Sequence, residues 1–408
     1  MWKTRAGSTG RLIQLCLGYF AFYVVYSVAL KYYTAKPPVP PRMADADFAV
    51  WSTLGGTLLC LGVVLAARWF HLHSTGQVTL GSFRFSRELL YVIPSGVCTA
   101  VVIPTTTLMY TLPITVMVAM IIMRGSIIIV SRAVDGLQIW QGILKKRVYA
   151  SENLAIVFAV LAVATQLFFA TWFKRPGEKD LQFQWTAAAS AILGSYVVAY
   201  TIRLYIMNYY KNTRPKGIAY DNKGFFGVEQ ISASSTLAVA AVAIYFWPTD
   251  LRQIVDFRRA VEVPSRYWLG STLAGATFGI VAFFSVFLFM FQGRTATFAG
   301  LVNRLTSLIA GTAATLVFAF GFGGRMPATA DWWSLGFIFV SVGLLSSAER
   351  RRVREATALA IADRYVAQFA GSEAEGRVLV ARARLRRKSG DLPAARADLQ
   401  SALALGAS

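Results

Sequence analysis

Long apolar stretches, separated by short polar segments, dominate the sequence. Each stretch has about 20 residues, the length that an α-helix needs to cross about 30 Å of hydrocarbon. Hydrocarbon offers no partners to backbone polar groups, so we expect helices rather than open strands. The pattern predicts ten membrane spans, over residues 11–31, 48–70, 89–110, 113–133, 152–173, 184–206, 226–247, 268–291, 297–321 and 332–348. The fold class is therefore an all-α polytopic membrane protein.

Composition supports this interpretation. Of the 408 residues, 56% are hydrophobic and 15% are charged, whereas soluble domains have roughly 45–50% apolar and about 25% charged residues. The charges are unbalanced, with 41 Lys and Arg against 20 Asp and Glu, a net charge of +21. Because the basic residues are spread along the flanks of the apolar stretches, they do not predict a nucleic-acid partner. The lipid bilayer is the first expected partner.

Basic residues are distributed unevenly between alternate connections. With the N-terminus in the cytoplasm, the inner segments hold 28 Lys and Arg, and the outer loops hold 11. Cytoplasmic loops of membrane proteins carry such an excess, so we predict that both termini lie in the cytoplasm. The Ala- and Arg-rich C-terminal tail is typical of a GC-rich bacterial gene, which favours the bacterial inner (plasma) membrane.

The composition changes after Ala348. The run Glu349-Arg-Arg-Arg-Val-Arg354 is expected to stop translocation and to contact anionic lipid headgroups. Residues 377–403 predict helix, turn and helix, similar to one tetratricopeptide unit. One repeat cannot bury a continuous core alone, so an amphipathic helical pair on the membrane or on a protein partner is the alternative. We divide the chain into a first five-helix half (1–173), a second half (174–348) and a cytoplasmic helical tail (349–408).

A shift of 180 residues aligns the third and fourth predicted spans with the eighth and ninth. Leu108, Thr115, Ala119, Arg124 and Ile129 then coincide with identical residues at 288, 295, 299, 304 and 309. An arginine inside each span is the match that chance supplies least readily. Five spans per half give the halves opposite orientations, so the sequence predicts an inverted repeat. In such transporters the substrate site lies at the midplane, between the repeats.

Two segments carry a resemblance to a known family. They are Val118-Ala-Met-Ile-Ile-Met-Arg-Gly-Ser-Ile-Ile-Ile-Val130 and Gly300-Leu-Val-Asn-Arg-Leu-Thr-Ser307. With ten spans in two inverted halves, the chain resembles the drug/metabolite transporter superfamily (EamA-like), in its solute carrier 35-like branch, which includes relatives of the chloroquine-resistance transporter. The resemblance covers residues 11–348. It implies secondary transport of a metabolite, a nucleotide-linked compound or a drug-like molecule.

Arg124 is the strongest candidate for a functional residue. It lies eleven residues into a predicted span, and a charge there costs at least about 2.5–3.5 kcal/mol on insertion scales. We expect Arg124 to bind an anionic substrate or to repel unsuitable ones, although hydrogen bonds to carbonyls of a kinked neighbouring helix would also explain it. Arg304 lies closer to a span end, where its side chain could reach the interface.

Polar side chains near the two arginines complete the predicted substrate site. Hydroxyls and amides inside spans can bind a solute, but they also bind neighbouring helices or their own backbone. The predicted substrate-binding residues are Arg124, Arg304, Asn303, Ser126, Thr306, Tyr110 and Thr115.

Signatures of enzymes and cofactor proteins are absent from the sequence. There is no phosphate-binding Gly-x-x-x-x-Gly-Lys, no paired carboxylates and no Ser/His/acid set within one span. His71 and His73 have no carboxylate or cysteine beside them in the sequence, and Cys16, Cys60 and Cys98 lie in apolar runs. We therefore expect that the protein is not an enzyme and that it binds no cofactor and no metal.

The predicted function is secondary transport of a small organic solute by alternating access. The alternative is a non-transporting membrane scaffold or sensor whose helices anchor residues 349–408 for a protein partner.

Overall fold

The computed structural model describes most of the chain. The described residues are 9–35, 42–74, 76–80, 83–144, 148–168, 186–214, 221–289, 296–372, 374–389 and 391–405.

Within the described residues, ten helices are long and apolar enough to cross a membrane. They confirm the ten predicted spans and the all-α fold class. Most begin or end within a few residues of the predicted bounds, and the differences lie at the ends where polar residues extend a helix. The ten are α1 (Thr9–Thr34), α2 (Asp45–Ala66), α3 (Leu89–Thr111), α4 (Val116–Trp140), α5 (Ala150–Leu167), α6 (Ala187–Asn212), α7 (Asn222–Phe246), α9 (Trp268–Phe289), α10 (Ala296–Phe322) and α11 (Thr329–Gln368).

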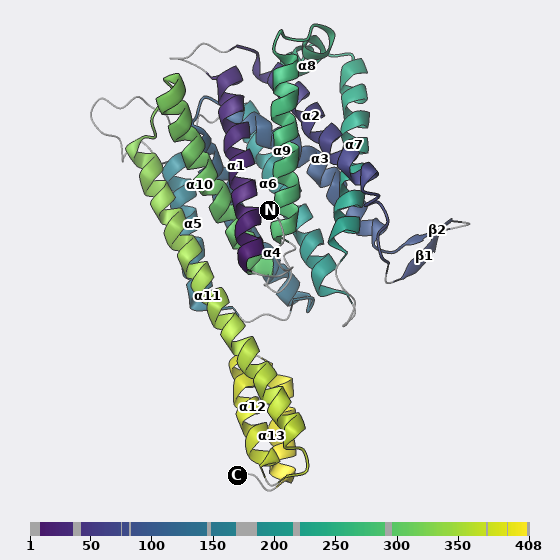
Figure 1. The fold of residues 1–408 in the computed structure, drawn as a ribbon, viewed down its shortest axis with the longest axis vertical. Helices are drawn as coiled ribbons and strands as arrows, with labels where there is room; N and C mark the ends of the chain where they lie inside the picture. Colours follow the sequence, from purple (N-terminus) through teal and green to yellow (C-terminus); the bar gives the residue numbers. More distant parts are fainter. Residues whose placement is uncertain are drawn as a thin grey trace.

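Two connections contain structure that the hydrophobic pattern does not predict. Helix α8 (Arg252–Glu262) lies across one end of the bundle (Figure 1), where the Trp51 side chain of α2 donates a hydrogen bond to the Ala260 carbonyl at 3.2 Å. Strands β1 (Gln77–Leu80) and β2 (Phe83–Ser86) form an antiparallel hairpin, with Gln77 opposite Ser86. Both are short and rich in charged or polar residues, so a search for long apolar stretches passes over them.

Helix α11 is longer than its predicted span. It has 40 residues and continues through the basic run at 349–354 without a break, because Ala, Arg and Glu all favour helix. The extension packs against α12 (Glu375–Ser389), which packs in turn against α13 (Leu392–Ala404). These three segments project from one end of the bundle (Figure 1). We call this end the tail end and the opposite one the far end.

Helix packing places α4 in the middle. α4 contacts α5, α6, α10 and α11, and it is the most enclosed of the ten spans. α3 packs against α6 and α7, α9 packs against α1 and α2, and α5 lies along α11 (Figure 1). Nearly every residue from Val116 to Ile128 is buried, so polar side chains on this stretch face protein rather than lipid.

A candidate binding site inside the helix bundle

Arg124 lies on the enclosed part of α4. Its side chain is 8% exposed, and its Nη2 donates a hydrogen bond to the Tyr23 hydroxyl of α1 at 3.3 Å. Its Nε is buried and has no hydrogen-bond partner among the described residues. The sequence leaves open, as an alternative, hydrogen bonds from Arg124 to carbonyls of a kinked neighbouring helix. The described bond goes instead to a tyrosine hydroxyl of another helix.

Tyrosines from three helices surround this guanidinium. Tyr19 and Tyr23 come from α1, Tyr110 from α3 and Tyr196 from α6, and all four act on Arg124 electrostatically. Each is at most 1% exposed. The Tyr23 and Tyr110 hydroxyls are 2.5 Å apart, and the Tyr110 hydroxyl also donates to the Met120 sulfur at 3.1 Å. Arg124 therefore lies in a buried shell of phenol groups drawn from separate spans.

Arg304 of α10 lies near this shell. It is 7% exposed, and its Nη1 donates to the Ser131 hydroxyl of α4 at 3.2 Å. Tyr196 and Tyr200 of α6 and Arg124 itself all act on Arg304 electrostatically. Ser131 follows Arg124 by seven residues, so the backbones of these two α4 residues are about 10 Å apart along the helix.

Two partly buried arginines of the described chain have carboxylate partners. Arg203 of α6 binds Glu229 of α7 through two nitrogens, at 2.8 and 2.9 Å, and Arg352 of α11 pairs with Glu152 and Glu349. By contrast, no carboxylate oxygen of the described residues lies within 4.0 Å of Arg124 or Arg304. Burying an unpaired charge is costly, so these two arginines stand out within one molecule.

The predicted spans 184–206 and 226–247 place Arg203 and Glu229 within a few residues of a span end. In the structure α6 continues to Asn212 and α7 begins at Asn222, so both residues lie inside helices. Glu229 is fully buried and also accepts hydrogen bonds from Ser95 and Thr99 of α3, at 2.6 and 3.2 Å. The pair connects α3, α6 and α7.

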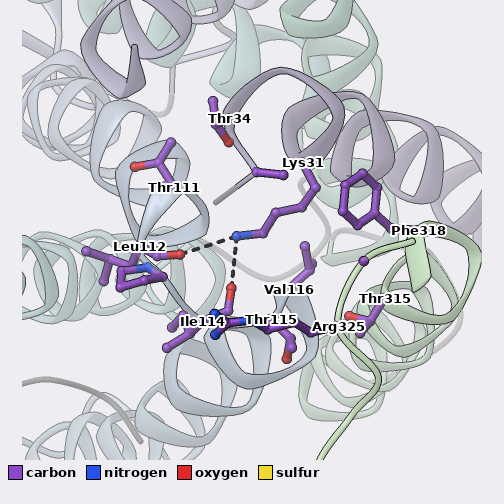
Figure 2. Close-up of a pocket in the computed structure, with 13 residues that line it drawn as sticks. Lys31, Thr34, Thr111, Leu112, Ile114, Thr115, Val116, Thr315, Phe318 and Arg325 are labelled. Atoms are coloured by element: carbon purple, nitrogen blue, oxygen red, sulfur yellow. Dashed lines mark hydrogen bonds between the residues drawn. The ribbon is translucent and has the colours of Figure 1, made fainter. Parts of the chain in front are cut away.

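A pocket opens at the far end of the bundle, above the arginines. Its volume is about 70 Å³, and Lys31, Thr115, Thr315 and Arg325 are among the residues that line it. Figure 2 shows the Lys31 ammonium directed at the Leu112 and Ile114 carbonyls, to which it donates at 3.3 and 2.8 Å. Val116, also in the lining, precedes Arg124 by eight residues on α4, a rise of about 12 Å.

The remaining predicted site residues do not all meet. Tyr110 lies beside Arg124, whereas Thr115 lines the far-end pocket and accepts a hydrogen bond from the Val118 N–H. Asn303 donates to Ser285 of α9 at 3.0 Å, and its Oδ1 has no partner in the described part of the chain. Thr306 bonds back to the Val302 carbonyl, and Ser126 is half-buried on α4.

The tyrosines at 19, 23, 196 and 200 are functional candidates that the sequence analysis missed. Their spacing carries the signal, because residues four apart lie on one face of a helix. Tyr19 and Tyr23 form such a pair on α1, and Tyr196 and Tyr200 form another on α6. A search for aromatic hydroxyls at this spacing within spans would have found them.

His73 has a carboxylate neighbour that its sequence environment does not reveal. Its Nδ1 lies 3.1 Å from Asp221 Oδ2, and its backbone N–H donates to the same oxygen at 3.0 Å. Burial acts to raise the pKa of Asp221, but hydrogen bonds from the N–H groups of His73 and Gly224 outweigh it and hold the pKa below its ordinary value. Within the described residues, no group of three or more metal-ligating side chains occurs.

Comparison with known proteins finds distant structural likeness alone. No family model matches the chain, and no curated protein matches it. A solved structure, described only as the crystal structure of a protein, is similar with a TM-score of 0.43 and 14% sequence identity, over 84% of this chain and 99% of that chain. A similarity this distant assigns no family.

Proposed function

We propose that this chain is a secondary transporter that moves a small organic solute across a membrane by alternating access. In this proposal Arg124 and Arg304 bind the solute, and the tyrosines at 19, 23, 110, 196 and 200 surround it. The observation that carries the proposal is the burial of these two arginines, without carboxylate partners among the described residues, in the middle of a ten-span bundle. Intramembrane charges of this kind mark substrate pathways in transporters.

Both predicted halves contribute to the proposed site. Tyr23, Tyr110 and Arg124 belong to the first five spans, and Tyr196 and Arg304 belong to the last five. The side chains of the proposed site are at most 8% exposed in this conformation. A solute would therefore reach the site only when helices separate on one side, as alternating access requires.

An inverted repeat remains part of the proposal, and the packing supports it. If each span of the first half is exchanged for its counterpart in the second, α3 becomes α9, and α6 and α7 become α1 and α2. The contacts of α3 with α6 and α7 then become those of α9 with α1 and α2. Likewise, the contact between α1 and α10 becomes that between α6 and α4. For the family, we propose the drug/metabolite transporter superfamily. For the orientation, we propose that both termini lie in the cytoplasm of a bacterium.

The test is transport by the purified full chain in proteoliposomes. Vesicles are loaded with the small-molecule fraction of a bacterial extract, and released compounds are identified by mass spectrometry. We expect at least one compound to leave vesicles that contain the wild-type protein and to be retained by those with Arg124→Ala. Arg252→Ala is the matched control, because the Arg252 side chain is 93% exposed.

Two results would contradict the proposal. One is the absence of any protein-dependent release, and the other is release that Arg124→Ala leaves unchanged. The Arg124→Lys variant refines the test, since lysine keeps the charge but cannot make a planar two-point contact.

A further inference from the structure

The geometry points to a specific class of solute: we propose that it is an organic dianion with two acidic groups joined by a short apolar segment. Arg124 binds one acidic group, and Arg304 binds the other. This inference rests on the proposed function, because it assigns the ligand of the same site.

Unused hydrogen-bond donors are the first argument. A guanidinium has five N–H groups, yet one hydrogen bond is described for Arg124, to Tyr23, and one for Arg304, to Ser131. The Nε atoms of both are buried without partners among the described residues. The planar guanidinium matches a carboxylate or a phosphate, which accept two parallel hydrogen bonds.

Charge is the second argument. Two other arginines inside the fold, Arg203 and Arg352, pair with glutamates. At Arg124 the strongest electrostatic neighbours are phenols. An anionic solute would supply opposite charge, and a solute without it would leave the Arg124 guanidinium uncompensated and the Arg304 guanidinium only partly offset.

Separation of the two arginines is the third argument. The Ser131 hydroxyl to which Arg304 donates belongs to a residue about 10 Å along α4 from Arg124, so each arginine offers a separate place for an acidic group. Tyr196 acts electrostatically on both arginines, and its ring lies 5.6 Å from that of Tyr200. These aromatic rings provide an apolar surface for the segment that joins the acidic groups.

Other charged groups make the site asymmetric. Asp135, one turn beyond Ser131 on α4, is the carboxylate that acts electrostatically on Arg304. Asp135 offsets part of the Arg304 charge, whereas the strongest electrostatic neighbours of Arg124 are the four tyrosines. We therefore expect Arg124 to bind an acidic group more strongly than Arg304 does.

The far-end pocket fits the same class of solute. Lys31 and Arg325 place two cationic side chains in its lining, and four threonines supply hydroxyls. It lies about 12 Å from Arg124 along α4. Cationic linings raise the local concentration of anions, so this pocket is where we expect a dianion to approach the arginines.

The test compares matched ligands that differ by one charge. Calorimetric titration of the full chain uses succinate, glutarate and phthalate, each against its monoamide, which has the same skeleton and one negative charge. We expect at least one dicarboxylate to bind about tenfold more tightly than its monoamide, as the loss of one charge-assisted contact implies. If no dicarboxylate exceeds its monoamide, the proposal is wrong.

Variants assign each arginine to one acidic group. With Arg304→Gln, the dicarboxylate and its monoamide should bind equally, whereas Arg124→Gln should abolish binding of both. Arg124→Lys and Arg304→Lys preserve the charge if the glutamine variants fail to fold, and they should keep the preference for the dianion with weaker binding. Arg252→Gln should leave every titration unchanged. Equal effects of the Arg304 and Arg252 variants would contradict the assignment.

Transport of the same ligands separates this inference from the proposed function. If dicarboxylates bind through Arg124 but never cross the vesicle membrane, the ligand class stands and the transport proposal fails. If the protein carries neutral or cationic solutes and ignores dicarboxylates, transport stands and the dianion proposal fails.

Discussion

At the scale of single residues, the arginines of the bundle divide by their partners. Arg203 has a glutamate that makes two hydrogen bonds to it, whereas Arg124 and Arg304 have only hydroxyl partners in the described chain. The difference matters because the cost of removing an ion from water is offset only by an opposite charge with good geometry. The pair at Arg203 shows how this molecule stabilises a permanent buried charge.

Loss of the Glu229 charge should therefore destabilise the protein. Glu229→Gln leaves the Arg203 guanidinium buried without a carboxylate, and breaking a buried pair in this way costs about 3–5 kcal/mol. We expect a clearly lower melting temperature for the purified protein in detergent. Asp256→Asn is the control, because its partner Arg252 is 93% exposed and an exposed pair contributes about 0.2–1 kcal/mol.

A double variant makes this experiment sharper. Arg203→Met combined with Glu229→Met removes both charges, and replacing a buried pair with apolar residues is often neutral. The double variant should melt close to the wild type. If Glu229→Gln alone melts like the wild type, then an unpaired arginine is tolerated here without cost, and the argument from Arg124 and Arg304 to an anionic solute weakens.

At the scale of helices, small residues set the distance between neighbours. Gly55 of α2 faces Thr272 of α9, and Gly275 of α9 faces Ser52 of α2. A Cβ built on Gly275 would lie 1.8 Å from the Ser52 carbonyl oxygen, and one on Gly55 would lie 1.9 Å from that of Thr272. Backbone atoms cannot turn aside as side chains can, so only glycine permits this approach.

Substitution of Gly275 should separate the two helices. Gly275→Ala forces α2 and α9 apart, and overpacking of this kind costs about 1–3 kcal/mol. Gly62→Ala is the control, because Gly62 is exposed on α2 with nothing within 4 Å of an added Cβ. Alanine favours helix over glycine by about 1 kcal/mol, so the two substitutions should shift the melting temperature in opposite directions. If both substitutions shift the melting temperature in the same direction, the close packing of α2 and α9 is contradicted.

Sequence patterns predict the spans well and the shorter elements poorly. Hydropathy over about twenty residues locates all ten bundle helices, because each must match the thickness of a membrane. It misses α8, whose eleven residues include Arg252, Arg258 and Arg259, and it ends α11 at Ala348, although the following basic residues continue the helix. Charge limits where a helix can cross the membrane, but it does not end the helix.

At the scale of the whole molecule, the site could be predicted only in part. The two arginines and Tyr110 follow from rare polar residues in apolar spans. The tyrosines at 19, 23 and 196 do not, because hydropathy treats a phenol as an aromatic side chain, and only tertiary packing brings three helices to one guanidinium. Whether a described arginine has a carboxylate beside it is likewise decided by residues distant in sequence, such as Glu229 for Arg203.

The contacts of the tail (the α11 extension, α12 and α13) bear on whether the molecule acts as a transporter or as a scaffold. Helix α11 is held to α5 at the tail end, where Arg352 pairs with Glu152 and Glu349, and the Tyr149 hydroxyl donates to Glu355. Beyond these contacts, the α11 extension, α12 and α13 bind mainly one another, through Arg382 and Arg386 with Asp363 and Asp398. The tail therefore contributes no described side chain to the arginine site.

Removal of the tail should accordingly leave transport intact. A chain that ends after Ala356 keeps Arg352 and Glu355 and hence the contacts between α11 and α5. We expect it to insert, to melt as a single species and to release the same solute from proteoliposomes at a rate within about twofold of the full chain, because ΔΔG values of independent sites add. Arg352→Ala in the full chain is the complementary variant, and it should reduce stability by removing the guanidinium that pairs with the buried Glu152 and Glu349. If truncation abolishes a cellular phenotype while Arg124→Ala has no effect on flux or phenotype, the helices serve to anchor the tail, and the scaffold is the function.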